Sequence, residues 1–188
     1  MMTLEDTIEL LLSLNANFPK KDREHKVGLY IETKMYNFYK QRGIDHAEVL
    51  FNVLKKYDIE TVEKASKKLP IIIECFESES LKKFATLSDL PLVFLMFYDN
   101  PFIPTYDLAE ISTFAHGVGP KYQYIFAYKN ETYDPKTPSL FVDEAHSYNL
   151  AVHPYILQDD DLKYAKDPVE EALAYLNKGV DGLFCEFP

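Results

Sequence analysis

Short apolar runs alternate with amphipathic segments along the chain, and this alternation limits the fold more than any other feature. Strand-like runs occupy residues 27–33, 71–76, 92–97, 117–120, 150–157 and 182–185. Segments with helical spacing occupy residues 3–14, 45–57, 80–85, 107–114, 139–148 and 167–177. Such alternation indicates a parallel sheet with helices on its faces. The sequence therefore predicts an α/β fold, either a β/α barrel or a doubly wound sheet.

Local signals mark where some of these elements begin. Thr3 precedes the apolar stripe of the first helix and can cap it. Asp167 followed by Pro168 is a strong start signal for the last helix. Residues 122–138 carry four tyrosines and two prolines, so we expect an inserted loop there.

No strand is followed by a glycine-rich phosphate fingerprint. Gly117 and Gly119 form only G-x-G-P, which is not a dinucleotide-binding motif. This favours a barrel over a dinucleotide-binding sheet.

Composition narrows the classes of function. The chain has 188 residues, of which 47% are hydrophobic, which suits a single domain with a sizeable core. A formal net charge of -10 argues against nucleic acid and anionic membranes as partners. It leaves room for a small anionic substrate whose charge is handled locally. No signal peptide, transit peptide or bilayer-length apolar run is present, and the localisation stays open.

The two cysteines, Cys75 and Cys185, each lie inside a short apolar run. We expect two buried thiols rather than a disulfide.

Glu32 and Lys34 close the first strand-like run and are the main candidates for a functional site. Alternate side chains on a strand share a face, so Tyr30, Glu32 and Lys34 are expected to point the same way. Ligands of parallel α/β proteins bind at the carboxyl ends of the strands. A carboxylate suits a hard cation and a lysine suits a phosphate. The alternative is a strand-end ion pair that binds nothing.

Five segments, in order, resemble the glycerophosphodiester phosphodiesterase family. They are I-E-T-K at 31–34, I-E-C-F at 73–76, F-A-H-G-V-G-P at 114–120, A-H-S-Y-N-L-A-V-H-P-Y at 145–155 and G-V-D-G-L-F-C-E-F-P at 179–188. The resemblance implies an incomplete (β/α)8 TIM-type barrel. It would hold about six of the eight strand–helix units, strands three to eight, in a single domain over residues 1–188. The two N-terminal units of the family domain would be missing.

The resemblance also implies a reaction, the hydrolysis of a glycerophosphodiester to an alcohol and glycerol 3-phosphate with a divalent metal, Mg²⁺ or Ca²⁺. Glu32 would bind the metal, Lys34 would hold the phosphate, and Tyr155 would contact the substrate. The family's H-R-G, E-x-D and second histidine do not occur in these 188 residues. No residue is therefore assigned as catalytic, and we expect the chain alone to have little or no activity.

One departure from the family pattern bears on the site, and three further groups of polar residues need an interpretation. Glu74 replaces the usual glutamine, so it needs either a partner such as Lys34 or a raised pKa. Residues 159–161 are three aspartates in a polar stretch, and we interpret them as a solvated turn rather than a metal cluster. His146 is expected to pack, and His153 to share a strand face with Tyr155.

Two other interpretations stay open. The chain could be an inactive barrel fragment that serves as a binding or assembly module and self-associates through open barrel edges. It could also be an unrelated six-stranded α/β protein, whose stability would not respond to metal.

Overall fold

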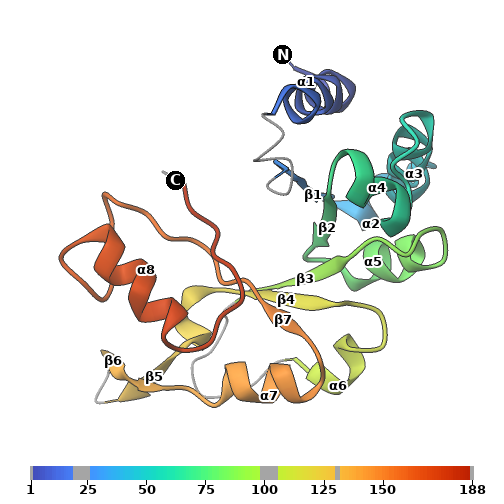
Figure 1. Cartoon of the computed structure of the whole chain (residues 1–188). Helices are drawn as coiled ribbons and strands as arrows, with labels where there is room; N and C mark the ends of the chain where they lie inside the picture. Colours follow the sequence, from blue (N-terminus) through green and yellow to red (C-terminus); the bar gives the residue numbers. More distant parts are fainter. Residues whose placement is uncertain (1, 19–25, 98–105, 130–131, 187–188) are drawn as a thin grey trace. The chain divides into compact units, whose positions relative to one another are not determined.

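The computed structural model describes residues 2–18, 26–97, 106–129 and 132–186 (Figure 1). Within 127–129 and 132–138 the description is of the backbone only. The chain divides into two compact units, Met1–Val93 and Phe94–Pro188. None of the helices in the described ranges is both long and apolar enough to cross a bilayer.

Among its described residues, the first unit holds two neighbouring parallel strands and five helices. The strands are β1 (Leu29–Glu32) and β2 (Ile71–Cys75), paired from Leu29 opposite Ile71 to Glu32 opposite Glu74. The helices are α1 (Leu4–Asn17), α2 (Tyr36–Lys40), α3 (His46–Lys56), α4 (Val62–Lys68) and α5 (Ser78–Ala85). Strand β3 (Leu92–Met96) begins in this unit and ends in the second.

The second unit contains two further strands of the parallel type and a separate antiparallel pair. The strands are β4 (Gly117–Pro120), parallel to β7 (Ala151–Val152), and β5 (Phe126–Lys129), antiparallel to β6 (Thr132–Pro138). Its helices are α6 (Leu108–Ile111), the 3-10 turn η2 (Tyr122–Tyr124), α7 (Phe141–Ser147) and α8 (Pro168–Leu176). One sheet has the strand order β1-β2-β3-β4-β7, and β5 and β6 form the other.

The α/β class is confirmed, but the predicted strands differ at the end of the chain. Residues 182–185 do not form a strand; Cys185 makes an isolated bridge to Leu157 instead. Strand β7 is two residues long, and Pro120 at the end of its partner β4 has no N–H to donate to it. Its pairing continues irregularly, with His153 donating to the Val118 carbonyl and Tyr155 to the Pro120 carbonyl.

The predicted loop at 122–138 was wrong, since it contains η2, β5 and β6. Aromatic and β-branched residues favour strands, and proline is tolerated at an edge that needs no donor. The prediction for Cys185 was also wrong: Cys75 is buried, but Cys185 is exposed. A residue that joins only an isolated bridge is not enclosed by neighbouring strands as a residue within a sheet is.

Helix starts follow the sequence closely. Thr3 and Asp6 form a capping box on α1, and Asp167 accepts hydrogen bonds from the first N–H groups of α8. Asp45 caps α3 in the same way. Behind these caps, apolar side chains such as Leu54 and Phe84 are buried and form the core of the first unit.

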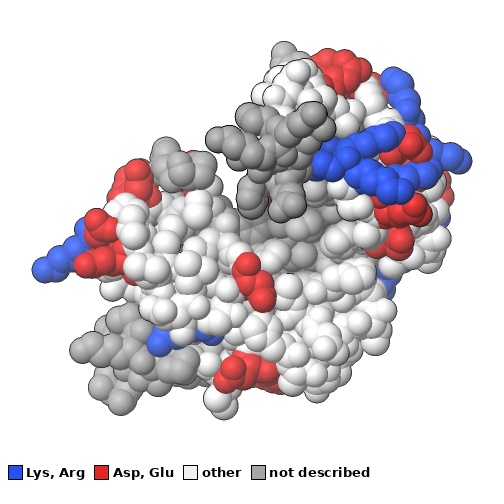
Figure 2. Space-filling model, in the orientation of Figure 1, with Lys and Arg blue, Asp and Glu red and all other residues white. Residues whose placement is uncertain are grey.

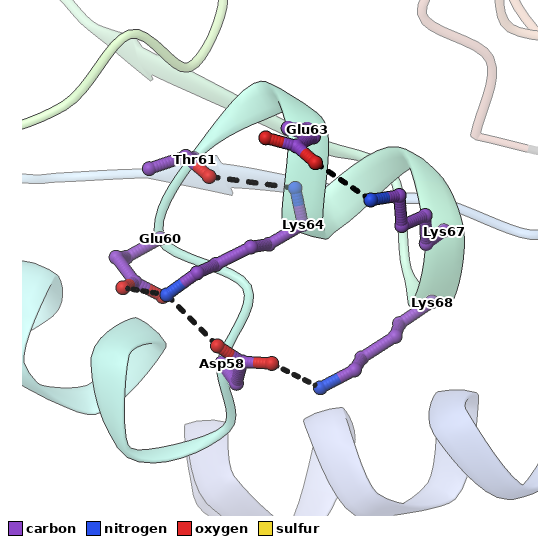
Figure 3. A network of polar contacts seen from close by, with 7 residues as sticks. All are labelled: Asp58, Glu60, Thr61, Glu63, Lys64, Lys67 and Lys68. Atoms are coloured by element: carbon purple, nitrogen blue, oxygen red, sulfur yellow. Dashed lines mark hydrogen bonds and ion pairs between the residues drawn. The ribbon is translucent and has the colours of Figure 1, made fainter.

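Helix α4 is surrounded by ion pairs between lysines and carboxylates (Figure 3). Lys64 contacts both Asp58 and Glu60, at 2.8 and 2.6 Å, and Lys68 contacts Asp58 at 2.7 Å. Figure 2 shows lysines and acidic residues intermingled over the helices of this unit, at the upper right. Because most of these groups are exposed, each pair adds little to stability.

Asn15 joins α1 to the start of β1 and the end of α4. Its Nδ2 donates to the carbonyls of Val27 (2.9 Å) and Lys68 (3.2 Å), and its Oδ1 accepts from the Val27 N–H at 3.0 Å. Asn15 itself is buried, whereas Val27 and Lys68, whose backbone groups it contacts, are exposed residues.

We expect Asn15→Ala to lower the free energy of unfolding by about 1–3 kcal/mol, because three hydrogen bonds between a buried amide and the backbone are lost. The matched control is Asn17→Ala, since Asn17 is exposed and its side chain donates within its own helix, to the Ser13 carbonyl. Urea unfolding followed by circular dichroism measures both. Equal midpoints for the two variants would contradict this role for Asn15.

Candidate functional site

The candidate site lies at the carboxyl ends of β1 and β2. The parallel register sets Glu32 opposite Glu74 and Tyr30 opposite Ile72. Paired residues of neighbouring parallel strands point to the same face, and the face repeats every second residue. Tyr30, Glu32 and Glu74 therefore share one face of the sheet, with the two carboxylates at its carboxyl edge.

Lys34 lies beside Glu32, as the sequence predicts. Its Nζ is 2.5 Å from Glu32 Oε2. The Lys34 side chain is 71% exposed and the Glu32 side chain 23% exposed, so the ion pair faces water. An exposed pair of this kind contributes little to stability, which leaves the lysine free to contact another anion.

Polar contacts fix the segment that leads from β1 to Lys34. The Thr33 N–H donates to the Glu74 carbonyl at 3.0 Å, and the hydroxyls of Thr33 and Ser80 are 2.9 Å apart and buried. Cys75 Sγ donates to the Thr33 carbonyl at 2.8 Å. Met35 then turns the chain into α2 with a left-handed φ of 56°. These contacts hold the end of β1 in place, as a binding site requires.

Glu74 is the unusual group of the site. It is 8% exposed, and its Oε2 has no hydrogen-bond partner within the part of the chain that the structure describes. Burial, and to a lesser degree the charge of Glu32, raise the pKa of Glu74 to about 7, although Lys34 partly opposes the shift. The raised pKa expected for an acid at this position is thus present.

Tyr155, the third predicted site residue, belongs to the second unit. Its hydroxyl donates to the Met96 carbonyl at 2.9 Å, and its N–H donates to the Pro120 carbonyl at 3.0 Å. Within one unit, the structure brings together only Glu32 and Lys34 of the three. The contact between Tyr155 and substrate stays a prediction.

Asp181 is a structural residue that the sequence reasoning did not single out. Its Oδ2 accepts from the Val152 N–H at 2.8 Å and lies 2.9 Å from His146 Nε2. Burial alone would raise the pKa of Asp181, but these hydrogen bonds hold it below its ordinary value. His146, expected to pack, is exposed and serves as a partner of this carboxylate instead.

Gly182 follows Asp181 in the segment at 179–188 and packs against His153. A Cβ atom at this position would lie 3.0 Å from Cδ2 of His153, a tight contact that the imidazole would have to relieve by shifting. The pKa of His153 is lowered by burial, although Asp181 opposes the shift. His153 therefore packs in its neutral form against the glycine.

Glu171 also escaped notice in the sequence. It is buried, and its Oε2 accepts the N–H groups of Lys163, Tyr164 and Ala165 at 2.7, 2.9 and 3.2 Å. It thereby shapes the loop before α8. The aspartates at 159–161 are exposed in that loop, in agreement with a solvated turn.

The described residues contain no group of three or more His, Cys, Asp or Glu side chains that could hold a metal ion. Two adjacent carboxylates, Glu32 and Glu74, nevertheless offer the oxygen donors that Mg²⁺ and Ca²⁺ prefer. The unpartnered Oε2 of Glu74 fits such an ion, because a buried carboxylate oxygen needs a positive or hydrogen-bonding neighbour. Glu32 and Glu74 are therefore the candidate oxygen donors for a metal in the first unit.

A model of the glycerophosphoryl diester phosphodiesterase family matches residues 2–188. The chain belongs to this family. This confirms the resemblance carried by the five sequence segments.

Two curated proteins of the same kind are similar in sequence. A glycerophosphodiester phosphodiesterase of Arabidopsis thaliana is 33% identical over 191 residues, covering 88% of this chain and 50% of that protein. One from Haemophilus influenzae is 30% identical over 214 residues, covering 99% of this chain and 56% of that protein. The chain thus spans about half the length of the curated family members it matches.

Two solved structures share the fold. One, from Silicibacter pomeroyi, is provisionally named a glycerophosphoryl diester phosphodiesterase; it has a TM-score of 0.63 at 16% identity and covers 98% of this chain and 52% of that one. The other is an Oleispira antarctica phosphodiesterase in complex with the product sn-glycerol-3-phosphate, with a TM-score of 0.62 at 16% identity, covering 99% of this chain and 57% of that one. At this identity the likeness concerns the fold alone.

The Glu74 carboxyl should make stability depend on pH. Its pKa is about 7 in the folded protein and close to 4.5 in the unfolded chain. The folded state binds this proton more tightly, so its contribution to the free energy of unfolding is largest below pH 4.5 and falls as the pH rises to 7. Glu74→Gln removes this term and should be more stable than the parent above pH 7 by about 3 kcal/mol.

Urea unfolding in chelator between pH 4 and 8 tests this expectation. Glu60→Gln is the opposite-sign control, because Glu60 is equally buried but a hydrogen bond from Lys64 lowers its pKa. The parent should lose stability relative to Glu74→Gln, and gain stability relative to Glu60→Gln, as the pH rises. A pH-independent difference between the parent and Glu74→Gln would refute the raised pKa.

Proposed function

We propose that this chain is part of a metal-dependent glycerophosphodiester phosphodiesterase. The reaction is the hydrolysis of a glycerophosphodiester to an alcohol and glycerol 3-phosphate. The observation that carries the proposal is the Glu32–Lys34 pair at the carboxyl ends of β1 and β2, in a chain that belongs to this family. The product bound to the Oleispira antarctica phosphodiesterase supports a small phosphate ester as the ligand.

The proposed roles follow from charge. Glu32 would hold a divalent ion. When bound, this ion would neutralise the charge that develops on the phosphoryl oxygens. Lys34 contacts the phosphate, and its exposed side chain is long enough to leave Glu32 and reach a ligand. Tyr155 contacts the substrate, and its hydroxyl, which donates to the Met96 carbonyl, can still accept a hydrogen bond.

We further infer one domain of incomplete (β/α)8 barrel type over residues 1–188. The family match over residues 2–188 and the sheet order β1-β2-β3-β4-β7 support this architecture. The chain contains neither H-R-G nor E-x-D, the motifs that the family resemblance associates with acid–base catalysis and further metal ligands. No catalytic residue is therefore assigned within it, and its own turnover is expected to be impaired.

An inactive binding or assembly module is the second candidate. The same missing motifs favour it, and β1 is an edge strand of the parallel sheet. Unprotected edges promote pairing with another chain.

The two candidates share a first test, the binding of sn-glycerol 3-phosphate in the presence of Ca²⁺. Lys34→Ala should weaken binding about tenfold, because a charged contact to the phosphate is lost. Lys55→Ala removes the same charge from an exposed position on α3 and should leave the affinity unchanged. Titration calorimetry measures both, and equal affinities for the parent and Lys34→Ala would overturn the assignment of Lys34.

Turnover by the chain alone tests the expectation that its activity is impaired. Release of glycerol 3-phosphate from glycerophosphocholine by the chain alone should stay at background, since the loss of acid–base groups typically costs about a hundredfold or more in rate. Lys34→Ala should then change nothing in this assay. Measurable turnover that Lys34→Ala abolishes would show that the chain is an active enzyme by itself.

Self-association through the sheet edges is also open to measurement. The module candidate predicts dimers or larger species that grow with concentration in analytical ultracentrifugation. A monomer over the whole concentration range would count against it.

A further inference from the structure

Glu74 is a buried acid without a described role in the fold. It is 8% exposed, and its Oε2 finds no hydrogen-bond partner among residues 2–18, 26–97, 106–129 and 132–186. An unpaired carboxylate in such a place is costly unless a proton, a cation or a hydrogen-bond donor reaches it. The position therefore points to a ligand.

Glu60 shows what a satisfied acid looks like in the same unit. It is 7% exposed, and one of its oxygens is likewise unpartnered. Its other oxygen, however, lies 2.6 Å from Lys64 Nζ, so its charge is balanced (Figure 3). For Glu74, the nearby lysine is Lys34, which is engaged with Glu32 instead.

The neighbour that faces Glu74 is a second carboxylate. Glu32 and Glu74 are register partners on adjacent parallel strands. Such strands lie about 4.8 Å apart, and Ca²⁺ binds oxygen at about 2.3–2.6 Å, so two glutamates in this relation can reach one ion. Two carboxylates and one ammonium leave a negative charge at the strand ends, which a divalent cation would neutralise.

We propose that Glu74 joins Glu32 as a second carboxylate ligand of a divalent cation, Mg²⁺ or Ca²⁺, at the carboxyl ends of β1 and β2. The inference rests on the proposed function, because it completes the metal site that Glu32 begins there. Binding of the ion requires Lys34 to release the Glu32 oxygen, and the 71% exposure of Lys34 allows it to do so. The buried contacts of Thr33 with Ser80 and Cys75 hold the strand end that carries Glu32.

Titration calorimetry with Ca²⁺ alone and with Mg²⁺ alone, at pH 8 and without phosphate ligands, tests the proposal. Glu74→Gln keeps the shape of the side chain and should weaken cation binding by about tenfold or more, since affinity follows the number of charged ligands. Glu32→Gln should do the same. Glu60→Gln, the matched buried control, and Glu63→Gln on exposed α4 should leave the affinity unchanged.

A second readout locates the ion without altering either carboxylate. Tyr30 lies on the same face of β1, two residues before Glu32, and its pKa is raised by burial and by Glu74. The chain has no tryptophan, so tyrosine excites the emission of bound Tb³⁺. Tyr30→Phe should reduce this emission while the calorimetric affinity for Ca²⁺ is unchanged.

The outcomes distinguish this inference from the proposed function. Cation binding that Glu32→Gln weakens and Glu74→Gln does not would overturn the role of Glu74 and leave the function standing. Absence of cation binding at millimolar concentrations would overturn it too. A third outcome is that Lys34→Ala leaves glycerol 3-phosphate binding unchanged while the cation still binds. This would refute the proposed function alone.

Discussion

The pairing of β1 with β2 is the constraint on which the candidate site depends. One parallel register places Glu32 opposite Glu74, and the Thr33 N–H on the Glu74 carbonyl continues it past the end of β1. A shift by one residue would move one glutamate to the other face of the sheet, because side chains alternate along a strand. The register therefore places two carboxyl groups side by side. The polar groups near them must accommodate this negative charge.

The sequence predicts well what is determined locally. The starts of α1 and α8 follow from Thr3 and Asp167, whose side chains cap N–H groups within three residues of themselves. Helices α2 and α4 were not predicted from the sequence. Each is shorter than two turns and has no long apolar stripe. The pair β5 and β6 was missed for another reason: each strand is stabilised by its partner, and pairing is not visible in either segment alone.

The site divides in the same way. Strand periodicity is enough to predict that Glu32 and Lys34 lie on one side, and they are in contact. The roles of Asp181 and Glu171 depend on N–H groups donated by Val152 and by the loop at 163–165. No sequence motif predicts which residue accepts these hydrogen bonds, because any buried acid or amide could fill the position. Glu74 stood out only because the family resemblance leads one to expect glutamine there.

A glutamate in place of a glutamine changes the physics of the strand ends. A glutamine is neutral at every pH and brings donors of its own, so it can face Glu32 without repulsion. A buried glutamate cannot remain both charged and unpaired beside Glu32 without destabilising the fold. Any cation that binds to it relieves this cost and stabilises the folded state by mass action. The free energy of unfolding and the occupancy of the cation site are thereby linked at Glu74. A change in cation concentration should therefore change the stability of the fold as well as the occupancy of the site.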